Sequence, residues 1–149
     1  MTEVRFYHLT RSTLEQALPT LLEKTIERGW HAVVMTDSDE RAEHLTQFLW
    51  TYRSDNFLPH GCKKDGRAEK QPLWITGADE NPNDASVLFL IHGAASDHVG
   101  DYDLVCEVFD GQQDQAVEEA RRRWKVYKEQ GYKISYWQQG PKGWESVGG

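Results

Sequence analysis

The sequence has few cysteines and no long apolar run. Each of these features excludes a class of protein. The two cysteines, Cys62 and Cys106, are too few for a disulfide framework, and neither belongs to a C-x-x-C pair. No stretch approaches the roughly 18 apolar residues of a membrane-spanning helix. The first ten residues lack the cationic and apolar segments of a secretory signal. We therefore expect reduced thiols and a cytoplasmic protein with no membrane partner.

The common motifs for nucleotides and metals are also missing. No G-x-x-x-x-G-K-[ST] is present, and no G-x-G-x-x-G follows an expected strand. The six histidines are scattered and form neither an H-x-x-x-H pair nor a Cys/His cluster of the kind that binds zinc. We expect no cofactor, no metal and no nucleotide-binding loop.

Positive charge is scarce and unevenly placed. The chain of 149 residues has a net charge of −7. Residues 1–111 hold 10 basic and 19 acidic residues, a net of −9, whereas residues 112–149 hold 7 and 5, a net of +2. An acidic whole argues against a protein that coats DNA non-specifically, because such proteins need a broad basic face. It leaves room for one local basic site near the end of the chain.

Alternation of β-rich and helix-periodic segments predicts the fold. Continuous apolar runs, typical of strands covered on both faces, come between segments with helical spacing, and this order favours a parallel sheet. Expected strands are 4–9, 31–36, 72–76, 86–91, 102–109 and 133–137; expected helices are 12–28, 37–50 and 112–130. The first helix has a capping box, Ser12 with Glu15, and Asp37 or Ser38 can cap the second. Pro19 indicates that the first helix kinks there or begins near Leu18.

These elements predict a Rossmann-like α/β domain of three layers, with five to seven mostly parallel strands and helices on both faces. We expect a single domain over residues 1–137 and a flexible tail over 138–149. Residues 51–71 are polar, lack a clear period and predict a long loop of the kind that is often functional.

The third helix has two distinct sides. Its apolar stripe comprises Ala116, Val117, Ala120, Trp124 and Tyr127. Arg121, Lys125 and Lys128 lie along one border of that stripe, whereas Arg122 and Arg123 point elsewhere and are interpreted as solubility charges, with Glu118 able to pair with Arg122. An arginine can hold a carboxylate through two hydrogen bonds, and a neighbouring indole offers a wall for a ring. These three cations and Trp124 either bind a ligand that is both acidic and apolar, or the cations are simply solvated at the side of a helix whose tryptophan belongs to the core.

Two other functions compete with this one. His92, Ser96 and His98 follow an expected strand, where α/β folds keep their sites, and would serve a small hydrolase. No G-x-S-x-G nucleophile elbow accompanies them, so a polar surface turn explains them as well. Alternatively, four rings could stack on the bases of a single-stranded nucleic acid. These rings belong to Trp124, Tyr127, Tyr132 and Trp137.

The order of several motifs resembles one family. They are FYHL, HAVVMTDSDE, LTQFLW, FLPHG, PLWIT, VLFLI, CEVFD and ARRRWKVYKEQGY. Together they look like the chi subunit of bacterial DNA polymerase III, over about residues 4–137. The resemblance implies a Rossmann-like fold without a nucleotide site and a non-enzymatic adaptor. It also implies association with the clamp loader and binding of single-stranded-DNA-binding protein, through that protein's acidic C-terminal tail, which ends in Ile-Pro-Phe.

The resemblance carries the family's two surfaces onto this sequence. The tail site falls on Arg121, Trp124 and Lys125, with Lys128 at a basic family position and Phe109 as a further lining residue. The second surface, which contacts the psi subunit in the family, resembles Trp50, Phe57, Leu58 and Pro59 here. A repair helicase is a further partner that the resemblance leaves open. The insert at 61–71 and the tail after Trp137 depart from the family pattern.

Overall fold

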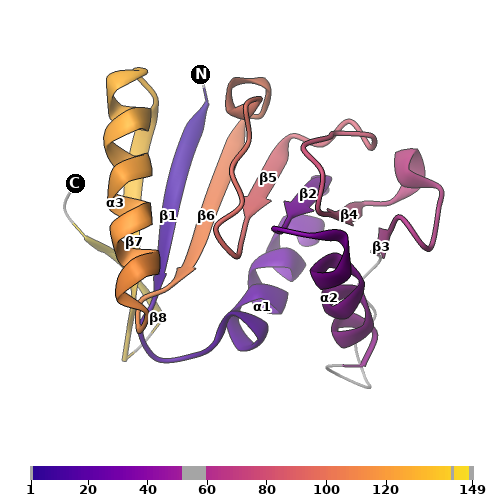
Figure 1. The fold of residues 1–149 in the computed structure, drawn as a ribbon, viewed down its shortest axis with the longest axis horizontal. Helices are drawn as coiled ribbons and strands as arrows, with labels where there is room; N and C mark the ends of the chain where they lie inside the picture. The colour runs from indigo at the N-terminus through magenta and orange to yellow at the C-terminus, as the bar shows by residue number, and fades with distance from the viewer. Residues whose placement is uncertain (1, 52–59, 142, 148–149) are drawn as a thin grey trace.

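One sheet of eight strands organises the fold in the computed structural model, which describes residues 2–51, 60–141 and 143–147 (Figure 1). The strand order is β3-β4-β2-β5-β6-β1-β7-β8. All neighbouring strands pair in parallel except β7 and β8, which are antiparallel. The strands are β1 (Glu3–Leu9), β2 (Ala32–Met35), β3 (Gly61–Cys62), β4 (Leu73–Thr76), β5 (Val87–Leu90), β6 (Leu104–Asp110), β7 (Lys133–Gly140) and β8 (Gly143–Val147).

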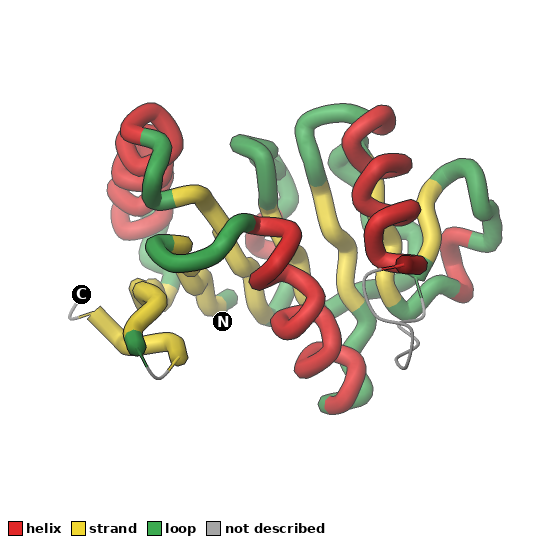
Figure 2. Tube along the Cα trace, turned by 90° about the horizontal axis from the view of Figure 1, so that it is seen from below, coloured by secondary structure: helices red, strands yellow, loops and turns green. Residues whose placement is uncertain are grey.

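Three α-helices cover the two faces of this sheet. They are α1 (Leu14–Glu27), α2 (Asp39–Thr51) and α3 (Asp114–Glu129), and two short 3-10 turns occupy Ala68–Lys70 and Val99–Asp101. Side chains of α1 and α2 belong to one core cluster and those of α3 to a second. Figure 2 shows α3 and α1 on opposite sides of the strands. The predicted three-layer α/β class is therefore confirmed, with more strands than expected.

The pattern of apolar residues explains why the sheet sits between two cores. Every residue of β2, β4 and β5 is buried, as expected for strands with layers on both sides. Strand β1 instead divides its side chains by alternation. Tyr7 and Leu9 join the core under α1, whereas Val4 and Phe6 join the core under α3. None of the helices in the described ranges has the length and apolar composition that a membrane span requires.

The start of α1 lies one residue later than the predicted capping box. Thr13 Oγ1 accepts a hydrogen bond from the Gln16 amide, and Gln16 Oε1 accepts one from the Thr13 amide. Ser12 is unavailable as a cap because its hydroxyl accepts a hydrogen bond from Gln139. The helix then runs through Pro19 without restarting. For α2, Ser38 is the cap, since its hydroxyl accepts from the Arg41 amide.

Two segments that we expected to be irregular contain strands. Strand β3 lies within the predicted loop 51–71 and pairs with β4. Strand β7 continues to Gly140, and β8 returns antiparallel to it, so the described part of 138–147 is built into the sheet rather than forming a loose tail. Both strands escaped prediction because β3 has only two residues and β8 follows a segment rich in glycine and glutamine.

Gln139 shows how this hairpin is tied to the rest of the fold. Its Oε1 accepts hydrogen bonds from the amides of Thr10, Arg11 and Ser12, at 3.0, 2.9 and 3.2 Å. Its Nε2 donates to the Ser12 hydroxyl at 2.7 Å. One side chain of β7 therefore organises the connection between β1 and α1, which are more than a hundred residues earlier.

Replacing Gln139 by alanine should destabilise the fold by about 1–2 kcal/mol, because three backbone donors lose their protein acceptor and only water can replace it. Urea unfolding measures the change. Gln138→Ala is the matched control, since that side chain makes no hydrogen bond to any described residue, and it should cost less than about 0.5 kcal/mol. Equal effects in the two variants would show that the Gln139 contacts contribute little.

Candidate functional site

A buried carboxylate in the sheet fixes how α3 lies on it. Glu107 of β6 is 1% exposed and lies between buried apolar neighbours in the strand. Its Oε2 accepts two hydrogen bonds from α3, one from Arg123 Nε and one from the Tyr127 hydroxyl, both at 2.8 Å. Because Arg123 and Tyr127 are one turn apart, they reach the same acceptor from one side of the helix. These two contacts fix both the rotation of α3 about its axis and its position along β6.

Burial dominates the titration of this cluster. Loss of contact with water raises the pKa of Glu107 above its ordinary value, while the Arg123 charge and the Tyr127 hydroxyl act in the opposite direction. The pKa of Tyr127 is raised too, by burial and then by the negative charge of Glu107. Arg123 is therefore no solubility charge, and that interpretation was wrong. A glutamate within an apolar strand was the sequence signal, since a buried carboxylate needs a partner.

The apolar stripe of α3 has two borders. Arg123 lies on the border that contacts Glu107, and Arg121, Lys125 and Lys128 lie on the other, with Trp124 between the two borders. We call Arg121, Trp124, Lys125 and Lys128 the α3 basic face. The three cations are exposed, and Trp124 is half-buried against the core under α3. Lys128 Nζ lies 4.8 Å from the centre of the Trp124 ring, a cation–π distance. Among the described residues, neither Arg121 nor Lys125 makes an ion pair, so both charges are available to a ligand.

Arg121 lies within electrostatic reach of a group of rings at the edge of α3. Burial lowers the pKa of His8, and the Arg121 charge lowers it further, while a hydrogen bond from the imidazole to the Gly111 backbone raises it. His8 Nδ1 and the Tyr136 hydroxyl are 2.6 Å apart. Phe109 stacks on His8 with ring centres 4.9 Å apart. A basic group beside clustered aromatic side chains suits a ligand with a carboxylate and a ring.

His8 and Tyr136 were missed in the sequence, although alternation along the two strands contains the signal. His8 alternates with Phe6, which faces α3, and Tyr136 pairs with Phe6 across β1 and β7. Gly111 allows the close approach of His8, because a Cβ added there would lie 2.0 Å from His8 Nε2. A larger residue at 111 would therefore displace the ring.

Phe109 is buried, at 6% exposed, and also lines a hollow at the carboxyl ends of the strands. This hollow of about 470 Å³ does not include Arg121 in its lining. It lies where α/β sheets commonly bind ligands. Its lining has four carboxylates against two arginines, so its net charge would repel a phosphate. The carboxylates belong to Glu15, Asp37, Asp110 and Glu119, and the guanidinium groups to Arg41 and Arg123. Phe109 therefore packs under the His8 ring and does not present an exposed surface beside Arg121.

Comparison with known proteins shows the family of the chain. A model of the family described as "DNA polymerase III chi subunit, HolC" matches residues 1–135. The chain belongs to the chi subunit family. A "Probable DNA polymerase III subunit chi" from Rickettsia prowazekii (strain Madrid E) is 37% identical over 91 residues. That match covers 61% of this chain and 55% of the relative, so the aligned part is little more than half of the relative's length.

The structure describes only part of the surface that we expect to contact a psi subunit. Trp50, in the last turn of α2, is 44% exposed, and its ring centre lies 4.0 Å from that of His60. Phe57, Leu58 and Pro59, the other three residues carried over from the chi family, lie outside the described residues. The expected psi contact therefore remains a prediction.

The hydrolase alternative lacks the necessary hydrogen bond. Ser96 Oγ donates directly to Asp79 at 2.6 Å, and it accepts from the backbone amide of His98. The imidazole of His98 lies near the carboxylates of Asp79 and Asp101, at 3.9 and 3.7 Å. His92 contacts the Thr36 hydroxyl at 2.6 Å. A triad needs histidine between the serine and the acid, whereas here the acid binds the serine directly.

The four rings proposed for nucleic-acid stacking do not form one surface. Tyr127 is buried and bonded to Glu107. Trp124 and Tyr132 pack on the core under α3, whereas Trp137 packs on the core under α1. The sheet therefore separates Trp137 from the other three rings. Within the part of the chain that the structure describes, no three His, Cys, Asp or Glu side chains form a group that could hold a metal ion.

Arg123→Ala should destabilise the fold by about 3 kcal/mol at pH 7, because it leaves the Glu107 carboxylate buried without its cation. Loss of the cation raises the folded-state pKa of Glu107 further, so the protonated acid becomes favourable as the pH falls. The loss of folding stability in Arg123→Ala should therefore be smaller at pH 5 than at pH 7. Chemical unfolding at the two pH values measures this.

Arg122→Ala is the matched control for that experiment. Arg122 is exposed and pairs with Glu118 across 3.9 Å, as predicted, so its loss should cost less than about 0.5 kcal/mol at both pH values. A similar, pH-independent loss in both variants would contradict the role assigned to Arg123.

Proposed function

We propose that the chain is a non-catalytic adaptor of the bacterial replicase. In this proposal, it links the clamp-loader side of DNA polymerase III to single-stranded-DNA-binding protein by binding the acidic C-terminal tail of that protein. Membership of the chi family supports a role in replication. The proposed partners are replication proteins, so the proposal includes a cytoplasmic location.

The α3 basic face is the observation that supports the proposal most strongly. Its charge is positive in a protein whose net charge is −7. Arg121 and Lys125 lack ion pairs among the described residues, and an ion pair with a ligand therefore need not break one within the protein. Trp124, partly exposed between these cations, offers an apolar contact for the terminal ring of the tail. Arg121 would hold the terminal carboxylate, with Lys125 and Lys128 attracting the acidic residues before it.

The rings next to Arg121 extend this surface toward β1 and β7. The neutral form of His8 is favoured at neutral pH because its pKa is lowered. It therefore adds an aromatic contact without competing for the carboxylate. A psi subunit on the Trp50 surface and a repair helicase are further partners within the same proposal, supported by the resemblance and by the exposure of Trp50.

Arg121→Ala should weaken the binding of a peptide with the acidic tail and a terminal Ile-Pro-Phe by about 1.5–3 kcal/mol, because a charged hydrogen-bond partner is lost. Isothermal titration calorimetry measures this affinity. Added salt should weaken binding to the unaltered chain as well. Arg122→Ala removes the same charge one residue away, on a different side of the helix, and should change the affinity by less than about 0.5 kcal/mol. Unchanged affinity in Arg121→Ala would contradict the proposed site.

A further inference from the structure

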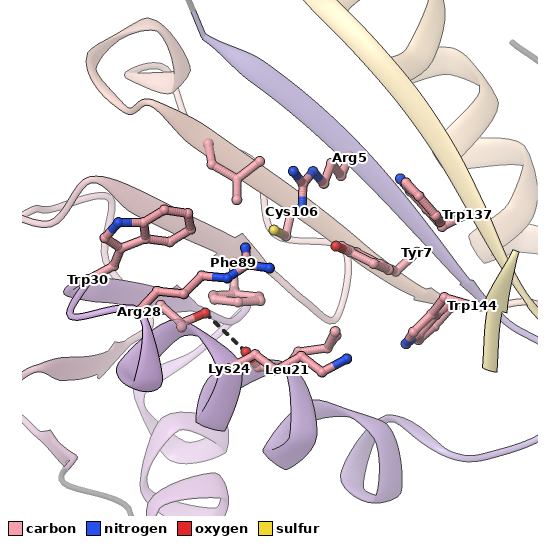
Figure 3. A pocket seen from close by; sticks show the side chains of 12 residues that line it. Arg5, Tyr7, Leu21, Lys24, Arg28, Trp30, Phe89, Cys106, Trp137 and Trp144 are labelled. Atoms are coloured by element: carbon pink, nitrogen blue, oxygen red, sulfur yellow. Dashed lines mark hydrogen bonds between the residues drawn. The ribbon is translucent and has the colours of Figure 1, made fainter. Parts of the chain in front are cut away.

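A second basic and aromatic surface lies on the other face of the sheet. A hollow of about 180 Å³ opens between the last turns of α1 and the β7–β8 hairpin, above β1, β5 and β6 (Figure 3). Its floor is formed by side chains of the three strands, including Tyr7, Phe89 and Cys106. Burial raises the pKa of the Cys106 thiol to about 12, so this floor carries no thiolate at neutral pH. No residue of the α3 basic face lines the hollow.

Aromatic side chains surround the hollow on two sides. Figure 3 shows Trp137 and Trp144 on the hairpin side and Trp30 on the opposite side, with Tyr7 between them. The Tyr7 and Trp144 rings meet edge to face at 5.0 Å and 72°. The Trp137 indole donates to Ser135, which holds its ring in place. Trp30 is 38% exposed, so a ligand can reach it without unfolding.

Three cations line the same hollow. Arg5 comes from β1, and Lys24 and Arg28 are one turn apart at the end of α1. Arg28 lies 5.2 Å above the Trp30 ring. No acidic side chain is among the described residues of the lining, although the whole chain is acidic. A helix C-terminus favours Lys24 and Arg28 there. Arg5, from the sheet, is already paired with the carboxylate of Glu3 on the same strand.

Size and chemistry together define the ligand. A cavity of roughly 150 Å³ lined by apolar side chains holds one benzene ring, so this hollow has room for a single ring system. Lys24 and Arg28 form no ion pair among the described residues, so two positive charges at the hollow remain for a ligand, whereas Arg5 is paired with Glu3. Indole and phenol rings with few free hydrogen-bonding groups suit bases that stack without regard to sequence. We propose that the hollow binds single-stranded nucleic acid, taking one base among the rings while Lys24 and Arg28 contact neighbouring phosphates.

This site is independent of the adaptor function proposed above. Trp137 and Trp144 pack on the core under α1, whereas Trp124 packs on the core under α3. The sheet separates the two surfaces, so an acidic peptide and a nucleic acid can bind at the same time. A protein that holds both would keep the strand near the partner that coats it.

Fluorescence anisotropy with a labelled oligothymidylate of about ten nucleotides tests the proposal on the full chain. Lys24→Glu with Arg28→Glu should weaken binding about tenfold or more, and should lower the salt slope by about 1.4, or 0.7 for each lost phosphate contact. Trp30→Ala should weaken binding about fivefold through lost stacking. These side chains are exposed, so the folded state should tolerate the changes, which circular dichroism checks.

Lys64→Glu with Arg122→Glu is the matched control, because it makes the same change in net charge at exposed residues away from the hollow. It should leave oligonucleotide affinity within about twofold. Arg121→Ala should keep oligonucleotide binding while losing the tail peptide, so failure of one proposal is distinguished from failure of the other.

Three results would overturn the inference. They are no binding by the unaltered chain at low salt, equal losses in the Lys24/Arg28 variant and the control, and loss of oligonucleotide binding in Arg121→Ala. A competition experiment distinguishes a nucleic-acid strand from a single nucleotide and from the acidic peptide. Neither thymidine monophosphate nor the acidic peptide should displace the oligonucleotide at equal concentration, and displacement by either would contradict the assignment to a nucleic-acid strand.

Discussion

The ion pair between Glu107 in the sheet and Arg123 on α3 is the contact on which the candidate site depends. Together with Tyr127, it holds one border of α3 against β6. Since residues on a helix keep fixed angles to one another, that anchor turns Arg121, Lys125 and Lys128 outward on the opposite border. A buried pair of this kind adds little net stability compared with apolar residues, but it specifies one arrangement strongly, because any other leaves a charge unpaired. Here that specificity positions a surface of three cations and a tryptophan.

The sheet gives the protein two separate surfaces of similar character. Both combine tryptophan with arginine and lysine, and both are positive although the chain is acidic. They differ in shape. The α3 basic face is a convex helix surface, suited to an extended peptide with its own carboxylate. The space beside α1 is concave and ring-sized, with cations on its rim. Different ligands are therefore expected on the two surfaces, even though each ligand combines negative charge with rings.

The fold was predictable from its apolar periodicity, whereas the details that position the site were not. Buried runs such as 87–90 and the stripe through Ala120 and Tyr127 follow directly from the sequence. Strand β3 is too short to have a period, and β8 is held largely by its pairing with β7, which no local pattern reveals. Arg121, Lys125 and Lys128 are exposed on the border of α3 that the helical spacing indicated, whereas Arg123 was misinterpreted. Its role depends on Glu107, sixteen residues earlier, and only tertiary packing brings the two together. Tertiary packing also brings His8 and Tyr136 within electrostatic range of Arg121.

The most direct test of the account follows the indole N–H signals of the six tryptophans by NMR while the acidic tail peptide is added. Each indole reports on a different place, and Trp124 is the one on the α3 basic face. We expect the Trp124 signal to shift with the peptide, together with the backbone amides of Arg121 and Lys125, while the signals of Trp30 and Trp144 stay in place. A titration that moves Trp30 and Trp144 and leaves Trp124 unchanged would contradict the central claim.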